Sequence, residues 1–408
     1  MLEYNTTLNI DAGDASGGPP NGAQSRVLGT STILGVTSGQ DPQIIMYKIP
    51  LSQPSFDKNE WENLKECIES TWISSAGHFI NKFEEKYAPF VGTKYAISVC
   101  NGTAALHLAL LGLSIGQGDE VIVPALTFVA SVNCVSYLGA KVVLADIDPV
   151  TWTIDPENVE KLITNKTKAI IAVHLYGYPA DLVRLRKIAD KHGLFLIEDA
   201  AEAIGAEIKG KKVGSIGDIG CFSFYGNKII TTGEGGMITL NSKELAEKII
   251  LYKNHGEGKP KYYHPVVGFN YRMTNLQAAV GLAQLEKIDD FLSKRERIDR
   301  LYRKYLDNIP GLILPPEDTE DRHGVCWLFS FLVNNKFRMS RGQLMKHLDK
   351  YGVETRPFFI PMHKMPMYRD NKSYPVSERV SIEGLNLPTF TDLTEKEIIR
   401  IARIIKSI

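Results

Sequence analysis

A lysine in a glycine-rich stretch is the first residue of this 408-residue chain whose surroundings suggest chemistry. Lys228 lies among apolar and small residues in the stretch 222–237. An amine that is partly removed from water has a lowered pKa and can attack a carbonyl carbon to form an imine. Most lysines are exposed, so Lys228 taken alone would more often be a surface residue in a turn.

A carboxylate at the end of an apolar stretch is the second candidate. Asp199 follows residues 194–197, which are predicted to be a buried strand, where an isolated negative charge is costly. A protonated pyridine nitrogen would be a suitable cationic partner, because a facing carboxylate keeps that ring an electron acceptor. The alternative is a helix N-cap whose carboxylate accepts backbone N–H groups.

A small polar turn between a strand and a helix, residues 101–105, could bind a phosphate group. Helix N-termini attract phosphate through free N–H groups and the helix dipole. Gly102 would allow close approach and Thr103 would add a hydroxyl, although many helices begin with threonine. Phe128, at another strand-to-helix turn, could cover one face of a flat ring or could simply be a core residue.

Alternating strands and helices are expected to position these residues. The pattern predicts βαβ units and a mainly parallel sheet, in which ligands bind beyond the carboxyl ends of the strands. Residues 101–103 and 124–128, His174 and Asp199 follow such strands. The expected strands are 95–100, 120–123, 141–145, 168–173 and 194–197, and the expected helices are 103–113, 128–138, 156–163 and 182–192.

The fold class that follows is α/β, with a large domain over residues 46–280 and a smaller C-terminal α/β domain over 281–408. The segment 274–308 is strongly helical with charges on one face, and we expect a solvated helix at the domain junction. Residues 1–45 hold seven glycines, five charged residues and one aromatic residue. Such a segment buries little surface, so we predict a flexible N-terminal extension.

Charge and composition argue against several classes of protein. Forty-seven lysines and arginines balance 47 aspartates and glutamates, so neither nucleic acid nor a membrane surface is an expected partner. Residues 121–140 carry no charge, but Pro124 and several polar residues favour a buried strand and helix over a membrane span. Five dispersed cysteines without a CxxC pair and no signal peptide favour a cytoplasmic protein. The nine histidines form no HxH or HxxxH pair, so no metal site is predicted.

Seven motifs in fixed order carry a resemblance to a known family. They are 72–77, 101–106, 124–128, 174–177, 198–203, 223–236 and 268–273. Together they resemble the motifs of pyridoxal-phosphate enzymes with the aspartate-aminotransferase-type fold (fold type I). More narrowly, the region 46–408 is similar to the DegT/DnrJ/EryC/StrS family of sugar aminotransferases, which aminate keto sugars attached to nucleotides.

The resemblance implies roles for four residues around the cofactor ring. Lys228 would bind pyridoxal 5′-phosphate through its amine and then move a proton between substrate and cofactor. Asp199 would pair with the pyridinium nitrogen. Phe128 would stack on the ring, and Glu202 would approach its phenolic oxygen.

The resemblance also implies how the cofactor phosphate is held. Gly102, Thr103 and Ser223 would bind it from within the chain. Asn270, on a loop expected to cross a subunit interface, would reach the phosphate of the neighbouring subunit. A homodimer with shared active sites is therefore implied.

The sequence most resembles the family members that transfer the amino group of L-glutamate to C4 of GDP-4-keto-6-deoxymannose. Their product is a building block of surface polysaccharides such as O-antigen. This resemblance rests on residues 74–80, 353–357, 362–368 and 384–388, together with the stretch around Lys228. Members that eliminate a hydroxyl group carry histidine at the position of Lys228, so transamination is favoured over elimination.

Substrate recognition leaves alternatives open. Arg356 and His363 would contact the nucleotide or the sugar, or else form a salt bridge and a capped turn within the C-terminal domain. A UDP- or dTDP-linked keto sugar, amination at C3, and a non-catalytic protein that binds pyridoxal phosphate are the other hypotheses.

Overall fold

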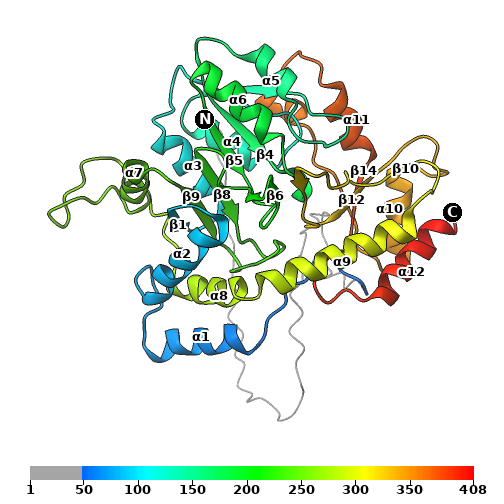
Figure 1. Ribbon diagram of the computed structural model, residues 1–408, viewed down its shortest axis with the longest axis horizontal. Helices are drawn as coiled ribbons and strands as arrows, with labels where there is room; N and C mark the ends of the chain where they lie inside the picture. The colour runs from blue at the N-terminus through cyan, green and yellow to red at the C-terminus, as the bar shows by residue number, and fades with distance from the viewer. Residues whose placement is uncertain (1–47) are drawn as a thin grey trace, which may run out of the picture.

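A seven-stranded mixed sheet forms the centre of the computed structural model, which describes residues 48–408 (Figure 1). The predicted extension, residues 1–45, lies outside the described residues. Strand β9 runs antiparallel to both of its neighbours, and all other adjacent strands are parallel, so the predicted mainly parallel sheet is confirmed. The strand order is β1 (Tyr95–Val99), β9 (Gly236–Leu240), β8 (Ile219–Ser223), β5 (Phe195–Asp199), β4 (Thr167–Val173), β2 (Glu120–Pro124) and β3 (Lys141–Ala145).

Helices cover both faces of this sheet. Alternate side chains of one strand enter different clusters: Val121 and Val123 of β2 pack into one, and Ile122 into another. Strands buried on both faces read as continuous apolar runs, as residues 121–123 do. The helices of this part are α2 (His78–Val91), α3 (Gly102–Gly112), α4 (Ala130–Tyr137), α5 (Pro156–Leu162), α6 (Leu182–His192) and α7 (Lys243–Lys253).

The uncharged stretch 121–140 forms strand β2 and helix α4, as the sequence predicts. Within residues 48–408, no helix combines the length and the apolar character that crossing a membrane requires.

The predicted single helix over 274–308 is wrong. The chain forms α8 (Asn275–Leu285) and α9 (Ile288–Leu306), which are separated by a turn at Glu286 and Lys287. Lys287 is held there by ion pairs to Asp57 and Glu60, at the start of α1 (Lys58–Glu69).

Helix α8 is also largely buried, in contrast to the solvated helix that was expected. A Cβ at Gly281 would lie 2.7 Å from Phe83, so the small residues of α8 let α2 pack closely against it. The charges that suggested a solvated face all belong to α9 or to the turn before it.

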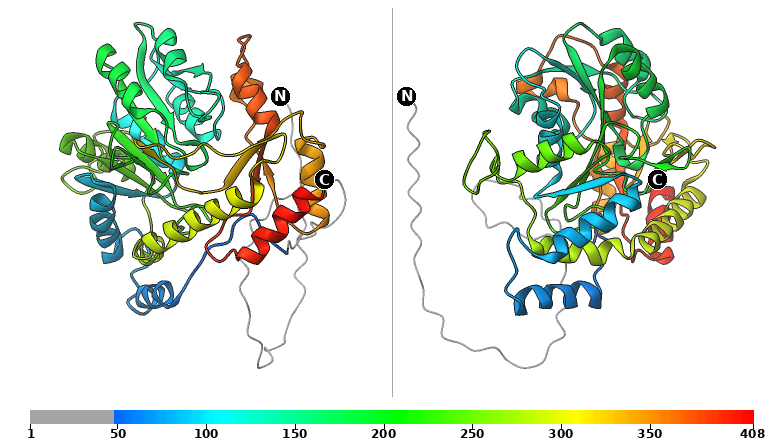
Figure 2. Two further views of the ribbon diagram at one scale, coloured as in Figure 1. Left: turned by 45° about the vertical axis from the view of Figure 1, so that its right-hand side comes forward. Right: turned by 60° about the vertical axis from the view of Figure 1, so that its left-hand side comes forward.

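A smaller antiparallel sheet carries the C-terminal part of the chain, in the order β10 (Leu312–Ile313), β12 (Phe329–Val333), β14 (Gly384–Leu387) and β13 (Arg356–Pro357). Its core includes Tyr302 of α9, whose ring stacks on Phe329 with centroids 4.7 Å apart. Helix α9 runs along α12 (Glu395–Lys406) (Figure 2). The remaining helices are α10 (Arg341–Lys350), α11 (Pro375–Glu383) and the short η1 (Leu175–Gly177), η2 (Met362–Lys364) and η3 (Pro366–Tyr368).

The two larger sheets are joined by more than the chain itself. Strand β11 (Arg322–His323) pairs with β6 (Glu207–Ile208), which pairs with β7 (Lys211–Lys212). Within the smaller part itself, the buried Arg295 of α9 donates to the carbonyl oxygens of Cys326, Trp327 and Thr389. The domain boundary at residues 280 and 281 stays a prediction.

Candidate active site

A cavity of about 510 Å³ lies at the carboxyl ends of β1, β2, β4, β5 and β8, where the sequence places a ligand site. Residues of the smaller sheet, among them Arg356 and Asn386, complete its wall. Eight of the ten predicted site residues line it: Gly102, Thr103, Phe128, Asp199, Glu202, Ser223, Lys228 and Arg356. Asn270 and His363 do not.

The Lys228 amine lies beside a carboxylate and an indole ring. Its Nζ atom is 3.7 Å from Oε1 of Glu202 and 4.0 Å from the ring centroid of Trp327. Burial lowers the pKa of Lys228, and the nearby carboxylates of Glu202 and Asp199 oppose that effect. A larger fraction of this amine is therefore neutral near pH 7 than for an exposed lysine.

The Glu202 carboxyl is buried as well. Burial raises its pKa to about 7, although Lys228 and the Tyr176 N–H group favour the ionised form. The Tyr176 N–H donates to Oε2 of Glu202 at 2.8 Å. Glu202 and Lys228 thus form a pair of groups that can hold or release a proton near neutral pH.

Asp199 is the last residue of β5 and is 6% exposed. Ser131 donates its hydroxyl proton to Oδ2 at 2.6 Å, and the Ala201 N–H donates to Oδ1 at 3.2 Å. No lysine, arginine or histidine within residues 48–408 forms an ion pair with it. No helix begins after Asp199, so the N-cap alternative is wrong, and a cationic ring nitrogen would supply the charge that is missing.

The start of α3 forms a close cradle with β8. The Asn101 side chain caps the helix by accepting the Ala104 N–H at 2.8 Å, which leaves the first N–H groups free. A Cβ at Gly102 would lie 2.9 Å from Cβ of Ser223, so only glycine allows this approach. The cradle offers neutral donors and the positive end of a helix dipole, which suit a phosphate group.

These observations test whether pyridoxal phosphate fits the residues present. The phosphate cradle, the uncompensated Asp199 carboxylate and the buried Lys228 amine line one cavity. Phe128, 54% exposed, adds an aromatic ring to the same wall. The set therefore matches the phosphate, the ring nitrogen and the aldehyde of this cofactor.

Two buried polar atoms on the cavity residues have no hydrogen-bond partner within the described part of the chain. They are Oδ1 of Asn227 and Nε of Arg356. Arg356 also donates from Nη2 to Glu354 at 3.3 Å, so the salt bridge that the sequence offered as an alternative coexists with its place in the cavity. Two residues of the cavity wall thus carry a buried polar atom whose hydrogen bonding is incomplete.

The other two predicted residues lie elsewhere. His363, in η2, is buried and bonds through Nε2 to Glu378 at 2.9 Å. Asn270 is exposed, and its Oδ1 accepts from Nε of Arg272 at 3.0 Å. Its loop also exposes Tyr262 (76%) and Val267 (87%).

Sequence reasoning missed several residues of the cavity, chiefly Tyr176 and Trp327. Tyr176 lies in the 174–177 motif, for which the sequence predicts no site residue. Its backbone is left-handed (φ 53°), its N–H donates to Glu202, and its hydroxyl accepts the Phe359 N–H at 3.1 Å. Trp327 belongs to the smaller part of the structure, and no local pattern links it to Lys228.

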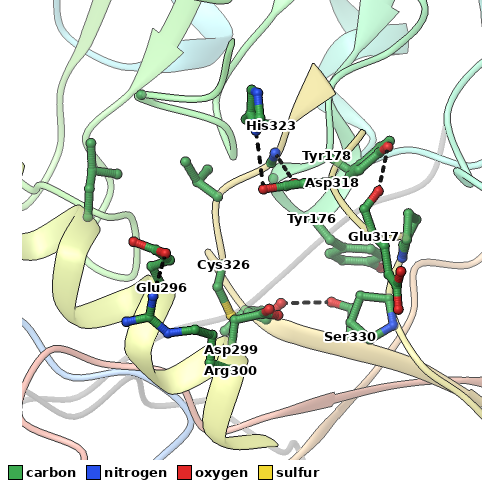
Figure 3. Close-up of a pocket in the computed structure, with 18 of the residues that line it drawn as sticks. Tyr176, Tyr178, Glu296, Asp299, Arg300, Glu317, Asp318, His323, Cys326 and Ser330 are labelled. Carbon is green, nitrogen blue, oxygen red and sulfur yellow. Dashed lines mark hydrogen bonds and ion pairs between the residues drawn. The ribbon is translucent and has the colours of Figure 1, made fainter. Parts of the chain in front are cut away.

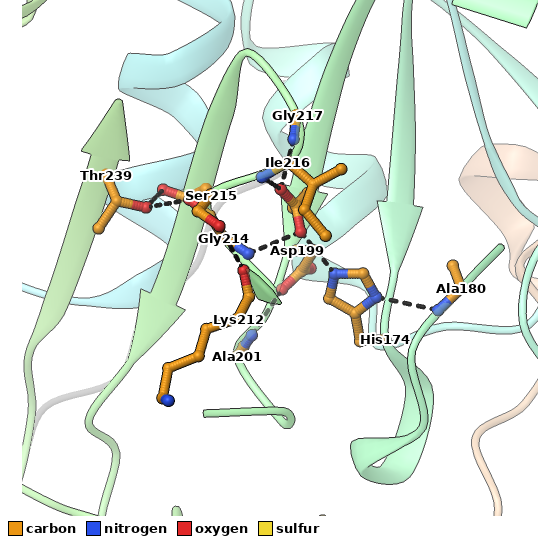
Figure 4. Close-up of polar contacts among 12 residues, drawn as sticks. His174, Ala180, Asp199, Ala201, Lys212, Gly214, Ser215, Ile216, Gly217 and Thr239 are labelled. Carbon is orange, nitrogen blue, oxygen red and sulfur yellow. Dashed lines mark hydrogen bonds and ion pairs between the residues drawn. The ribbon is translucent and has the colours of Figure 1, made fainter. Parts of the chain in front are cut away.

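His174 and Glu198 form a buried polar network behind the site. Figure 4 shows His174 of this network together with Gly214, Ile216 and Gly217. Adjacent strand residues face opposite sides, so Glu198 points away from the face of Asp199. Glu198 accepts the N–H groups of Gly214, Ile216 and Gly217 and bonds to His174 Nε2 at 3.1 Å. The His174 N–H donates to the Asp199 carbonyl oxygen, so this network fixes the strand ends that carry the site.

A second cavity, of about 740 Å³, shares Tyr176 and Leu328 with the first (Figure 3). Both of its arginines are paired: Arg300 with Glu296 at 2.7 Å and Arg303 with Asp299 at 2.6 Å. The Tyr178 hydroxyl donates to the carbonyl oxygen of Glu317. None of the ten predicted site residues lines this cavity.

Comparison with known proteins identifies the family. The family model described as DegT/DnrJ/EryC1/StrS aminotransferase family matches residues 54–406. A GDP-perosamine synthase of Caulobacter vibrioides is 48% identical to this chain, in an alignment that covers 87% of this chain and 96% of that protein. A GDP-perosamine synthase of Escherichia coli O157:H7 is 47% identical, over 87% of this chain and 97% of that protein. The solved structure of a putative sugar aminotransferase, Spr1654 from Streptococcus pneumoniae in its PLP form, is 28% identical and superposes with a TM-score of 0.84 over 88% of this chain and 98% of that one. The expected fold type I is confirmed, and the chain belongs to the DegT/DnrJ/EryC1/StrS aminotransferase family, as a pyridoxal-phosphate-dependent sugar aminotransferase.

Proposed function

We propose that this chain transfers the amino group of L-glutamate to C4 of GDP-4-keto-6-deoxymannose and so forms GDP-perosamine. The main support for an amino-group transfer is the buried Lys228 amine, which lies beside Glu202 at the carboxyl ends of the strands. The choice of nucleotide and sugar is supported by the names of relatives that are nearly half identical to this chain.

The cofactor would be held by the chain as follows. Gly102, Thr103 and Ser223 would bind its phosphate through neutral donors, Asp199 would keep its ring nitrogen protonated, and Phe128 would cover one face of the ring. When bound, pyridoxal 5′-phosphate supplies an aldehyde that takes up the amino group and a ring that withdraws electrons.

Lys228 would move the proton at the reacting carbon. Nζ would take the proton from the α-carbon of glutamate and pass it to the cofactor in the first half-reaction, and it would carry a proton back from the cofactor to C4 of the sugar in the second. Its lowered pKa favours the neutral amine that the first of these steps needs. Both half-reactions use one site, so 2-oxoglutarate leaves before the sugar binds and the kinetics are ping-pong.

Arg356 would bind the nucleotide-linked sugar. It is the cationic side chain of the cavity wall other than Lys228, and a guanidinium group suits a phosphate or a sugar oxygen. A contact between His363 and the substrate stays a prediction.

The active form would be a homodimer in which Asn270 completes the partner's phosphate site. This role is supported by the position of Asn270, exposed and outside the cavity of its own chain. Chains carrying Lys228→Ala and Asn270→Ala test it when they are mixed. If sites are shared, each hybrid dimer has one complete site, and random mixing restores about a quarter of the wild-type activity.

If Asn270 served its own chain, neither site of the hybrid would be complete and mixing would restore nothing. Light scattering coupled to gel filtration measures the mass of the assembly in the same samples.

Substrate choice is tested by mass spectrometry of reactions that contain L-glutamate, pyridoxal phosphate and one ketone at a time. The ketones are GDP-4-keto-6-deoxymannose and the UDP- and dTDP-linked 4-keto-6-deoxy sugars. Amination of the GDP sugar alone is the expected result. Amination of a UDP or dTDP sugar instead would keep the mechanism and replace the substrate, while a colourless protein that aminates none would favour the non-catalytic alternative.

A further inference from the structure

A tryptophan of the smaller part of the structure contacts both the lysine of the larger part and the residue before it. Trp327 lies just before β12, lines the active-site cavity and is 4% exposed. Its ring centroid is 4.0 Å from Nζ of Lys228. Its indole N–H donates to the carbonyl oxygen of Asn227 at 2.7 Å, so the same side chain also fixes the backbone that precedes the lysine.

The contact with the amine has a definite electrostatic sign. The face of an indole ring is negative and attracts a cation, most strongly where water is excluded. The charged groups around this amine are Glu202 at 3.7 Å, Asp199 at the end of β5, and Glu234 and Arg356 in the cavity wall. The Glu202 carboxyl, which faces Lys228, can gain or lose a proton as the pH changes, whereas the indole attraction is the same at every pH.

We propose that Trp327 is a positioning residue for the proton transfer, which holds the freed Lys228 amine over its ring and beside Glu202. The inference rests on the proposed function of Lys228. When Nζ takes the proton of the donor's α-carbon, the C–H bond breaks, an N–H bond forms, and the electron pair left on the carbon would be withdrawn by the ring of the bound cofactor. The ammonium group that results is a cation in a buried site, and the indole face stabilises it until the proton is delivered.

A packing role alone would give Trp327 different properties. Its ring also stacks on Tyr176, with centroids 6.3 Å apart and an interplanar angle of 12°. Trp152 offers a matched comparison, because it is 3% exposed, packs on Phe358 and lines the second cavity rather than the first. Loss of either ring would lower the stability of the fold, but only loss of the Trp327 ring would change the pKa of the Lys228 amine.

The test measures the pKa of Lys228 in the apoprotein. The rate at which acetic anhydride labels Lys228 is followed against pH by peptide mass spectrometry. Trp327→Leu is expected to lower this pKa by about one pH unit, Trp327→Phe by less, and Trp152→Leu not at all. An unchanged pKa in Trp327→Leu would overturn the proposal and leave Trp327 as a packing residue.

A second measurement covers the case in which Trp327→Leu does not fold. Replacing all four tryptophans by 5-fluorotryptophan keeps their shape and weakens the negative ring face. A lowered Lys228 pKa supports the proposal, and an unchanged one contradicts it.

The holoenzyme separates this inference from the proposed function. In a single turnover with L-glutamate, the pH profile of the half-reaction is expected to move with the pKa measured in the apoprotein. A pKa that falls while the profile stays fixed would mean that Trp327 acts on the amine but that Lys228 does not move the proton.

Discussion

The two cavities that share Tyr176 and Leu328 differ in how their charges are satisfied. In the larger one, arginines of α9 pair with carboxylates one turn away, as Arg303 does with Asp299 and Arg300 with Glu296. In the smaller one, Asp199 lacks a cationic partner among the described residues, Lys228 is desolvated, and Arg356 keeps an unpaired donor. Groups whose charge or hydrogen bonding is incomplete mark a functional site, because a bound ligand can supply the partner that they lack.

The strongest test of this difference is Lys228→Ala. We expect loss of the covalently bound cofactor and a fall in kcat of about 10⁴-fold, because both the attachment point and the proton carrier are removed. Absorbance spectra and steady-state rates measure the two effects. The exposed Lys243→Ala is the matched control and is expected to leave both unchanged; substantial activity in Lys228→Ala would contradict the proposed function.

A pair of aspartates, one from each cavity, gives the next largest effect. Asp199→Asn is expected to lower the rate of the glutamate half-reaction by about 10²–10³-fold, because the ring nitrogen loses its counter-charge. Asp299→Asn weakens only an ion pair with Arg303 and is expected to cost about 1 kcal/mol of unfolding free energy with little change in rate. Equal rate losses in the two variants would remove the distinction between the cavities.

The buried Glu202 carboxyl predicts a pH effect on the apoprotein. Its pKa is about 7, above its ordinary value of 4.5, so the folded state binds the proton more tightly than the unfolded chain does. Protonated Glu202 therefore adds to the free energy of unfolding. This contribution is fully present below pH 4.5 and is lost as the pH rises to about 7. At about 1.4 kcal/mol per pH unit, it amounts to about 3 kcal/mol.

Urea unfolding of the apoprotein at several pH values measures this contribution. Glu202→Gln is expected to remove the decline between pH 4.5 and 7. If the free energy of unfolding of Glu202→Gln declines with pH as steeply as that of the wild type, another group must titrate in this range.

The smallest effect is expected in the larger cavity. Arg300→Ala breaks an ion pair with Glu296 in which both side chains are 65% exposed, and such pairs contribute about 0.5 kcal/mol or less. Neither kcat nor cofactor binding should change. A clear loss of activity would mean that the second cavity takes part in the reaction.

Much of the site was predictable because its motifs are local. Asn101 and Gly102 follow one strand, Asp199 ends another and Glu202 lies just beyond it, and the carboxyl ends of parallel strands meet at one edge of the sheet. The pattern was less informative where two helices follow one another. A continuous helical pattern over 274–308 hides a turn that Lys287 stabilises through Asp57 and Glu60, more than 200 residues earlier in the chain.

The sequence by itself determined the family, the mainly parallel sheet and the residues proposed to meet the cofactor, since each of these depends on short motifs and on alternating strands and helices. Only the tertiary structure decided that Trp327 lies against Lys228, that Tyr176 holds Glu202, and that Asn270 lies outside its own cavity. These contacts join segments far apart in the chain. They depend on how the packed sheets and helices meet, which no local pattern of residues specifies.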